Sequence, residues 1–171
     1  MFLIILDVQE YYTLNQMTDS SSLVLVNAVN EVIENIDINQ VVYVTRVHQV
    51  LNLSFSRPLI YTSHDTLAMR QDSRLKIVND RIFQRENPDA FACKALTNFL
   101  EQNHATEIII VGLRAEEFLY QSLISGKELG YEIFMIPEAI AGKSHKRKDK
   151  AILKLQEKGI KLLKMPSLIQ E

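Results

Sequence analysis

The sequence predicts an open α/β fold, in which a six-stranded, mostly parallel sheet lies between two layers of helices. Short apolar runs alternate along the chain with longer segments whose apolar residues recur at three- and four-residue steps. Such alternation is typical of parallel strands joined by right-handed helical crossovers. The segment 107–118 carries the strongest indication, because its run of Ile and Val ends at Gly112 and opens into a helical pattern. We therefore expect a Rossmann-type, three-layer αβα sandwich.

Length and composition fit a single domain over residues 1–171. A chain of 171 residues with 47% hydrophobic content can bury one sizeable core but not two. The net charge of −2 gives no reason to expect a nucleic-acid partner, and no apolar run approaches the roughly 18 residues of a membrane span. One cysteine excludes an intramolecular disulfide and fits a reducing compartment. We expect a cytoplasmic protein with no leader and no membrane partner.

The first half of the chain contains three predicted strands. The apolar runs 2–6 and 41–45 have the continuous character of strands covered on both faces, and the first ends at Asp7. A polar stretch without clear periodicity follows at 11–22, and apolar spacing then predicts a helix over 23–35. A long irregular connection is expected over 46–75, and connections of this kind usually cover or form a site. The next predicted elements are a short strand at 81–84, a turn at 87–89 and a helix over 90–102.

The second half continues the alternation. Gly130 and Gly159 stand in helix-stop positions, and Pro137 is expected to end a strand. The predicted elements are a fourth strand at 107–112, a helix over 115–129, a fifth strand at 132–136, a helix over 144–158 and a sixth strand at 161–163.

Three motifs occur in a fixed order along this alternation. They are Leu-Ile-Ile-Leu-Asp-Val-Gln at 3–9, Arg-Glu-Asn-Pro-Asp-Ala-Phe at 85–91, and Ile-Ile-Val-Gly-Leu-Arg-Ala-Glu-Glu-Phe at 109–118. Together they resemble the isochorismatase-like hydrolases, which include nicotinamidases and other cysteine amidohydrolases. The resemblance covers nearly the whole chain and implies the isochorismatase-like version of the αβα fold.

The resemblance implies a catalytic triad of aspartate, lysine and cysteine, and the matching positions here are Asp7, Arg85 and Phe118. A thiol with a pKa of about 8.5 needs a nearby base or cation for activation. A phenyl ring has no nucleophilic atom, and a guanidinium stays protonated and cannot shuttle a proton. Asp7 and Arg85 are therefore expected to form a salt bridge, with a functional carboxylate as the alternative. Phe118 is either a plug over that pair or an aromatic floor for a flat ligand.

Five further residues are expected to line a pocket at this position: Arg114, Leu113, Glu117, Phe91 and His48. The resemblance also implies an oxyanion-stabilising turn, built on a tight and often cis peptide, where small residues are usual. Leu113 and Arg114 occupy that turn here.

A resident metal is not expected. Nicotinamidase-like members carry an Asp-x-His pair after the second strand, and the matching residues here are Arg46, Val47 and His48. Because arginine cannot ligate a divalent cation, the carboxylate of the set is missing. We expect no metal and no cofactor, with His48 as an ordinary loop histidine.

Three other features have an ordinary interpretation and a functional one. Cys93 shares a helix face with leucines, so it is either a small core residue or a nucleophile. Glu116 and Glu117 begin a helix, where carboxylates are common, and they could alternatively act as catalytic acids. The basic run 143–150 is either a solvated surface or a site for an anion or an acidic partner.

The sequence therefore favours a protein of this family without cysteine hydrolase activity, a pseudoenzyme. It would bind a small molecule or form an oligomer, with a dimer or tetramer implied by the resemblance. The alternative is an active hydrolase of an amide or enol ether that uses a rebuilt site around Asp7. A structural subunit that works through its surface is a third hypothesis.

Overall fold

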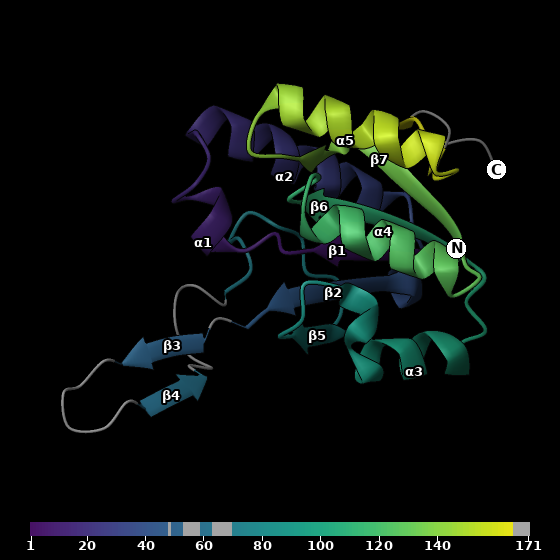
Figure 1. The fold of residues 1–171 in the computed structure, drawn as a ribbon, viewed down its shortest axis with the longest axis horizontal. Coiled ribbons are helices and arrows are strands. Elements are labelled where there is room, and N and C mark those ends of the chain that lie inside the picture. The colour runs from purple at the N-terminus through teal and green to yellow at the C-terminus, as the bar shows by residue number, and fades with distance from the viewer. Residues whose placement is uncertain (48, 53–58, 63–69, 166–171) are drawn as a thin grey trace.

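The computed structural model describes residues 1–47, 49–52, 59–62 and 70–165 (Figure 1). Its main sheet has six parallel strands in the order β5-β2-β1-β6-β7-β8, so β1 and β6 lie at the centre. The strands of this sheet are β1 (Phe2–Leu6), β2 (Val41–Arg46), β5 (Ile82–Arg85), β6 (Glu107–Leu113), β7 (Glu132–Ala141) and β8 (Lys161–Leu162). The predicted open, parallel sheet of six strands is confirmed.

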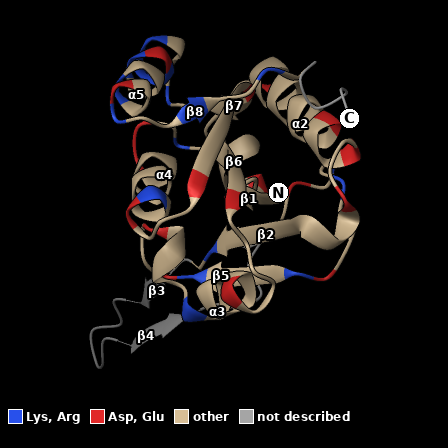
Figure 2. Cartoon of the chain, turned by 90° about the vertical axis from the view of Figure 1, so that its right-hand side faces the viewer, with Lys and Arg blue, Asp and Glu red and all other residues tan. Residues whose placement is uncertain are grey.

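Helices cover both faces of the sheet, as Figure 2 shows in an edge-on view. The helices are α1 (Glu10–Thr13), α2 (Asp19–Glu34), α3 (Lys94–Gln102), α4 (Phe118–Glu128) and α5 (His145–Glu157), with single 3-10 turns at Ile38–Gln40 and Ala90–Ala92. One buried cluster joins α2 to one face, and a second joins α3, α4 and α5 to the other.

Strand β1 shows how the sequence produces the two clusters. All five of its side chains are buried, and alternate residues point to opposite faces of a strand. Leu3 and Ile5 belong to the cluster with α2, whereas Ile4 and Leu6 belong to the cluster with the other helices. A continuous apolar run is therefore the pattern that a strand covered on both sides requires.

An antiparallel hairpin lies within the connection that the sequence predicts to be irregular. It consists of β3 (Gln49–Asn52) and β4 (Leu59–Thr62), which form a separate two-stranded sheet at one end of the molecule (Figure 1). The expectation of no strand between 46 and 75 was wrong. Each strand has only four residues, so neither presents enough alternation to stand out from its polar flanks.

Strand β7 continues through Pro137, so the expectation that this proline ends the strand was also wrong. The pairing register shifts between Ile110 and Gly112, and residues 136–139 lie opposite a single residue of β6. A β-bulge tolerates proline because the ladder does not use every amide there. Strand β7 thereby reaches Ala141, level with the end of β6.

Helix starts differ from the predicted ones where capping chemistry acts locally. Helix α2 begins four residues early, because the side chain of Thr18 accepts a hydrogen bond from the amide of Ser21. Helix α4 begins three residues late, because residues 115–117 form a turn closed by a hydrogen bond from the Glu117 amide to the Arg114 carbonyl at 2.8 Å.

None of the helices in the described ranges combines the length and apolar character that a membrane span requires.

Candidate functional site

An ion pair between Asp7 and Arg85 lies at the carboxyl edge of the sheet. Asp7 directly follows β1 and Arg85 is the last residue of β5, so the strand β2 between them separates the two in the sheet. Arg85 Nη2 donates to Asp7 Oδ2, and both side chains are fully buried. Arg85 Nη1 donates to the carbonyl of Asn87. The second motif of the sequence thus delivers a cation to the carboxylate of the first.

Burial raises the pKa of the Asp7 carboxyl to about 6. Desolvation is the largest cause, and it outweighs the opposing effect of the guanidinium groups of Arg85, Arg46 and Arg114. Among the described residues, no group bonds Asp7 Oδ1, so only one carboxylate oxygen is engaged by Arg85. Asp7 also has a left-handed backbone, with φ of 57°, which turns the chain at the end of the strand. A carboxyl group of this kind titrates close to neutral pH.

Phe118 lies against two guanidinium groups. It is the first residue of α4 and is half-buried, and its ring centroid lies 5.1 Å from the guanidinium carbon of Arg85 and 4.4 Å from that of Arg46. Cations above an aromatic face are attracted by its quadrupole. The structure therefore brings Asp7, Arg85 and Phe118 together, with the ring against the cation that pairs with the carboxylate.

Arg114 ties the turn before α4 to the start of the chain. Its Nη1 lies 3.2 Å from Glu117 Oε2, its Nη2 donates to Gln16 Oε1 at 2.5 Å, and its guanidinium carbon lies 5.3 Å from the Tyr12 ring. Glu117 also pairs with Lys143. Although desolvation opposes the shift, the hydrogen bond from Lys143 and the charges of Arg114 and Lys143 lower the pKa of Glu117. Both carboxylate oxygens of Glu117 are therefore engaged by cations at neutral pH.

Gln9 and Tyr12 also lie at this site, although neither was predicted from the sequence. The Gln9 side chain is buried and holds the backbone of Arg46 twice, accepting from its amide at 2.8 Å and donating to its carbonyl at 3.1 Å. Burial raises the pKa of Tyr12, and the guanidinium groups of Arg46 and Arg114 oppose that rise. Gln9 could have been found from its place two residues after Asp7 at a strand end; no comparable signal marks Tyr12.

The remaining pocket residues of the prediction have different places. Leu113 is buried in the core cluster with α2. Phe91 stacks on Tyr131, with ring centroids 5.7 Å apart, just before β7 begins. That contact lies toward the amino edge of the sheet, so the structure does not bring Phe91 to the carboxyl edge with Asp7. His48 lies outside the described residues.

The turn after β6 is tight without a cis peptide, since every peptide bond in the described part of the chain is trans. Gly112 has φ of 124° and Arg114 has φ of 65°. A Cβ at Gly112 would overlap the carbonyl oxygen of Leu6 on the neighbouring strand β1. Glycine is thus required at this contact between β6 and β1.

The metal that the resemblance to nicotinamidases implies does not fit the residues that the structure describes. The guanidinium of Arg46 occupies the position expected for a carboxylate ligand and lies over Phe118 instead. No cluster of three or more His, Cys, Asp or Glu side chains with metal-binding geometry occurs in the described ranges.

The single cysteine of the sequence lies on another element. Cys93 precedes α3, and its Sγ donates a weak hydrogen bond to the carbonyl of Gln84 at 3.5 Å. It packs half-buried beside the core cluster of α3 and α4. It is not on the turn that leads into α4, where the third motif would place a nucleophile.

Comparison with known proteins supports the assignment of the fold. Three solved structures resemble the chain at low identity: an isochorismatase-like hydrolase from Alkaliphilus metalliredigens (TM-score 0.78, 14% identity, covering 98% of this chain and 95% of that one), a pyrazinamidase of Pyrococcus horikoshii in complex with zinc (0.75, 19%, 95% and 97%) and a pyrazinamidase/nicotinamidase from Streptococcus mutans (0.76, 16%, 94% and 98%). No curated protein matches the sequence. The family model described as "Isochorismatase domain" matches residues 1–166. This chain belongs to the isochorismatase family.

Proposed function

We propose that this isochorismatase-family protein lacks cysteine hydrolase chemistry and acts as a small-molecule-binding or oligomer-forming pseudoenzyme. The observation that carries the proposal is the position of the Phe118 ring, 5.1 Å from the guanidinium carbon of Arg85, which is itself paired with Asp7. The three residues that match the family triad thus contact one another as an ion pair beneath an aromatic ring.

The chemistry of the three side chains supports the same proposal. Covalent acyl transfer needs a nucleophilic atom, and a phenyl ring supplies none. A guanidinium stays protonated at all accessible pH values, so Arg85 stabilises charge but does not transfer a proton. Cys93, the single thiol of the sequence, lies after β5, whereas the nucleophile of the third motif would lie after β6. Its Sγ donates a weak hydrogen bond to the carbonyl of Gln84. Paired with Arg85, whose guanidinium lies against the Phe118 ring, Asp7 serves chiefly to neutralise a buried cation.

A second candidate function rests on the carboxylate oxygen of Asp7 that Arg85 does not engage. Its Oδ1 bonds no described residue, and its pKa of about 6 would let the carboxyl act as a general acid or base near neutral pH. A hydrolase built on this group would activate water directly and would need no thiol. Amides and enol ethers are the substrate classes that the family resemblance favours.

Ligand binding separates the two candidates by thermal shift. Nicotinamide and pyrazinamide are suitable probes, because the titles of similar structures name nicotinamidases and pyrazinamidases. If Phe118 fills the position, neither compound should stabilise the native protein, whereas Phe118→Ala should open space for both. Phe99→Ala, in α3, is the matched control because it removes a ring that contacts Arg81 instead. Stabilisation of the native protein that is lost in Asp7→Asn would support the hydrolase candidate.

The proposal also covers the cellular location and the oligomeric state of the protein. We place it in the cytoplasm, since its single cysteine fits a reducing compartment. We also propose a homodimer or homotetramer, in keeping with the family resemblance.

A further inference from the structure

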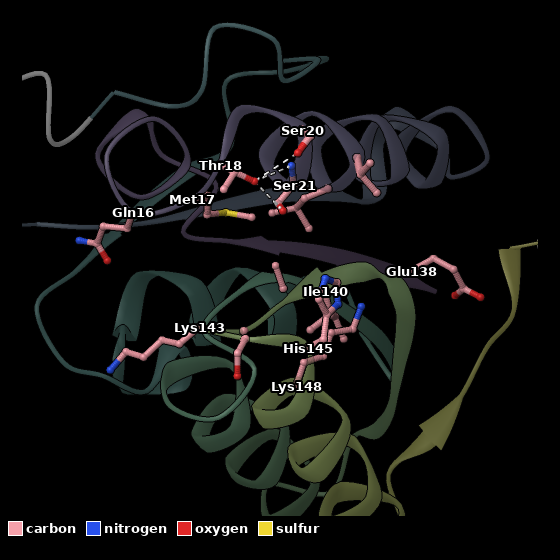
Figure 3. Close-up of a pocket in the computed structure, with 15 residues that line it drawn as sticks. Gln16, Met17, Thr18, Ser20, Ser21, Glu138, Ile140, Lys143, His145 and Lys148 are labelled. Atoms are coloured by element: carbon pink, nitrogen blue, oxygen red, sulfur yellow. Dashed lines mark hydrogen bonds between the residues drawn. The ribbon is translucent and has the colours of Figure 1, made fainter.

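A pocket of about 430 Å³ lies at the carboxyl end of β7, between the start of α2 and the start of α5. Its wall comes from two segments that are far apart in the sequence. Residues 16–25 include the start of α2, and residues 138–148 run from the end of β7 into α5 (Figure 3). Asp7, Arg85 and Phe118 do not line it, so this pocket is separate from the family site.

The floor of the pocket is apolar and aliphatic. Met17, Val24, Leu25 and Ile140 line it, and no Phe, Tyr or Trp side chain does. Val24 is 67% exposed although it is fully apolar, so it is a surface that a ligand could cover. A volume of this size with apolar walls and a few polar groups is typical of small-molecule sites. The walls favour a flexible aliphatic body over a flat aromatic one.

One wall carries a half-buried cation without an acidic partner. Lys148 lines the pocket, and across the described residues no carboxylate oxygen lies within 4.0 Å of its ammonium group. Burial lowers the pKa of Lys148, against the weaker opposing influence of Asp149 and Glu138. A partly desolvated ammonium of this kind gains most from an anionic ligand that enters the same pocket.

The other charged groups at the pocket differ from Lys148. Lys143 is already paired with Glu117, and Glu138 and His145 are exposed. Figure 3 shows Lys148 and His145 beside Ile140, across the pocket from Met17. The pocket thus combines an aliphatic floor with one available cation on its rim.

We propose that this pocket binds a medium-chain aliphatic carboxylate, whose chain covers Val24 and Ile140 and whose carboxylate pairs with Lys148. The proposal concerns a second site and does not depend on whether Asp7 is catalytic. A single carboxylate matches the single unpaired cation, and an unbranched chain matches an aliphatic floor without Phe, Tyr or Trp.

Octanoate tests the proposal, with octan-1-ol as its uncharged counterpart and acetate as the head group without the chain. Binding is measured on the full chain by calorimetry and by two-dimensional amide NMR. Octanoate should move the amide signals of 16–25 and 138–148 and should bind more tightly than either analogue. Lys148→Gln should weaken octanoate binding by roughly tenfold or more, the effect of losing one charge-assisted hydrogen bond, and should leave octan-1-ol unaffected.

Two variants complete the experiment. Lys146→Gln is the matched control, because Lys146 lies in the same exposed turn of α5 and does not line the pocket; it should leave octanoate binding unchanged. Val24→Asp places a negative charge on the floor of the pocket and should also weaken the binding of octanoate. Equal binding of octanoate and octan-1-ol, equal effects of Lys148→Gln and Lys146→Gln, shifts confined to other residues, or no binding would each overturn the proposal.

Discussion

The surroundings of Asp7 act on the charge of its carboxylate in two opposite directions. Its carboxylate is fully buried, which favours the neutral acid, and it is paired with Arg85, which favours the anion. The balance leaves its pKa at about 6, above the value near 3.9 of an unfolded aspartate. The folded protein therefore holds the proton more tightly than the unfolded chain.

The pH dependence of stability follows from this difference. Between about pH 4 and pH 6 the folded state binds more protons at Asp7 than the unfolded state, so the free energy of unfolding falls as pH rises through this range. Asp7→Asn removes the titration. The stability of the native protein relative to this variant should fall by on the order of 3 kcal/mol from pH 4 to pH 7, as measured by urea unfolding. A relative stability that stays flat or rises with pH would show that the pKa of Asp7 is not raised.

Removal of the cation should reveal how far the pair depends on both partners. Arg85→Met leaves a buried carboxylate without its ion pair and should cost about 3–5 kcal/mol at pH 7. The cost should be smaller at pH 5, where more of the Asp7 carboxyl is protonated. Arg85→Lys keeps the charge and should cost less than Arg85→Met. Urea unfolding at both pH values measures these differences.

Arg147→Met is the control for the loss of a guanidinium. Arg147 is exposed and has no ion pair among the described residues, so its replacement should change stability by less than about 0.5 kcal/mol. A cost for Arg85→Met no larger than that of Arg147→Met would contradict a structural role for the pair.

At the scale of elements, the junction of β1 and β6 determines where the site can form. Gly112 pairs with Leu6 and has a positive φ, and a Cβ there would overlap the Leu6 carbonyl. Gly130 also has a positive φ of 93°, but a Cβ there would meet no atom within 4 Å. Alanine substitutions at the two glycines therefore distinguish the cost of steric overlap from the cost of a left-handed backbone.

Gly112→Ala should be far more damaging than Gly130→Ala. The second variant pays only the cost of a left-handed alanine, about 1–2 kcal/mol. The first must also push two central strands apart and should exceed about 4 kcal/mol, which is exceptional for a point mutation. Urea unfolding at one pH gives both values. Similar losses in the two variants would mean that β1 and β6 can separate at little cost.

The sequence predicts elements well where they are long or fully buried. The central strands β1, β2 and β6 were found because their buried runs are nearly continuous. The edge strands β5 and β8 are short and largely exposed, so their place in the alternation indicated them rather than their burial. The hairpin of β3 and β4 was missed because short pairing strands carry little periodicity. The extension of β7 past Pro137 was missed because a bulge depends on the neighbouring strand, which local propensity cannot report.

The candidate site was predictable only in part, for the same reason. Motifs identified Asp7, Arg85 and Phe118, since each lies at a strand end or helix start. The Tyr12 ring lies under the guanidinium of Arg114, which is far away in the sequence, and no pattern in the sequence indicates that contact. Phe91 was expected to line the pocket at the carboxyl edge of the sheet, but its ring stacks on Tyr131.

At the scale of the whole molecule, the outer strands of the sheet leave apolar side chains at the surface. Ile82 of β5 is 45% exposed and Leu162 of β8 is 37% exposed, and these two strands form the edges of the six-stranded sheet. Edge strands offer unpaired backbone groups to another chain. Light scattering after size-exclusion chromatography should therefore give the mass of a dimer or tetramer. A mass of 19.7 kDa across a hundredfold range of concentration would contradict this prediction.

The central claim concerns chemistry and is tested most directly by the release of ammonia from nicotinamide and pyrazinamide. We expect purified native protein to release no more ammonia than a blank without protein, because no nucleophile lies at the start of α4. Asp7→Asn should be indistinguishable from the native protein in this assay. Ammonia release that exceeds the blank, survives Phe118→Ala and disappears in Asp7→Asn would contradict the claim and identify an active hydrolase built on Asp7.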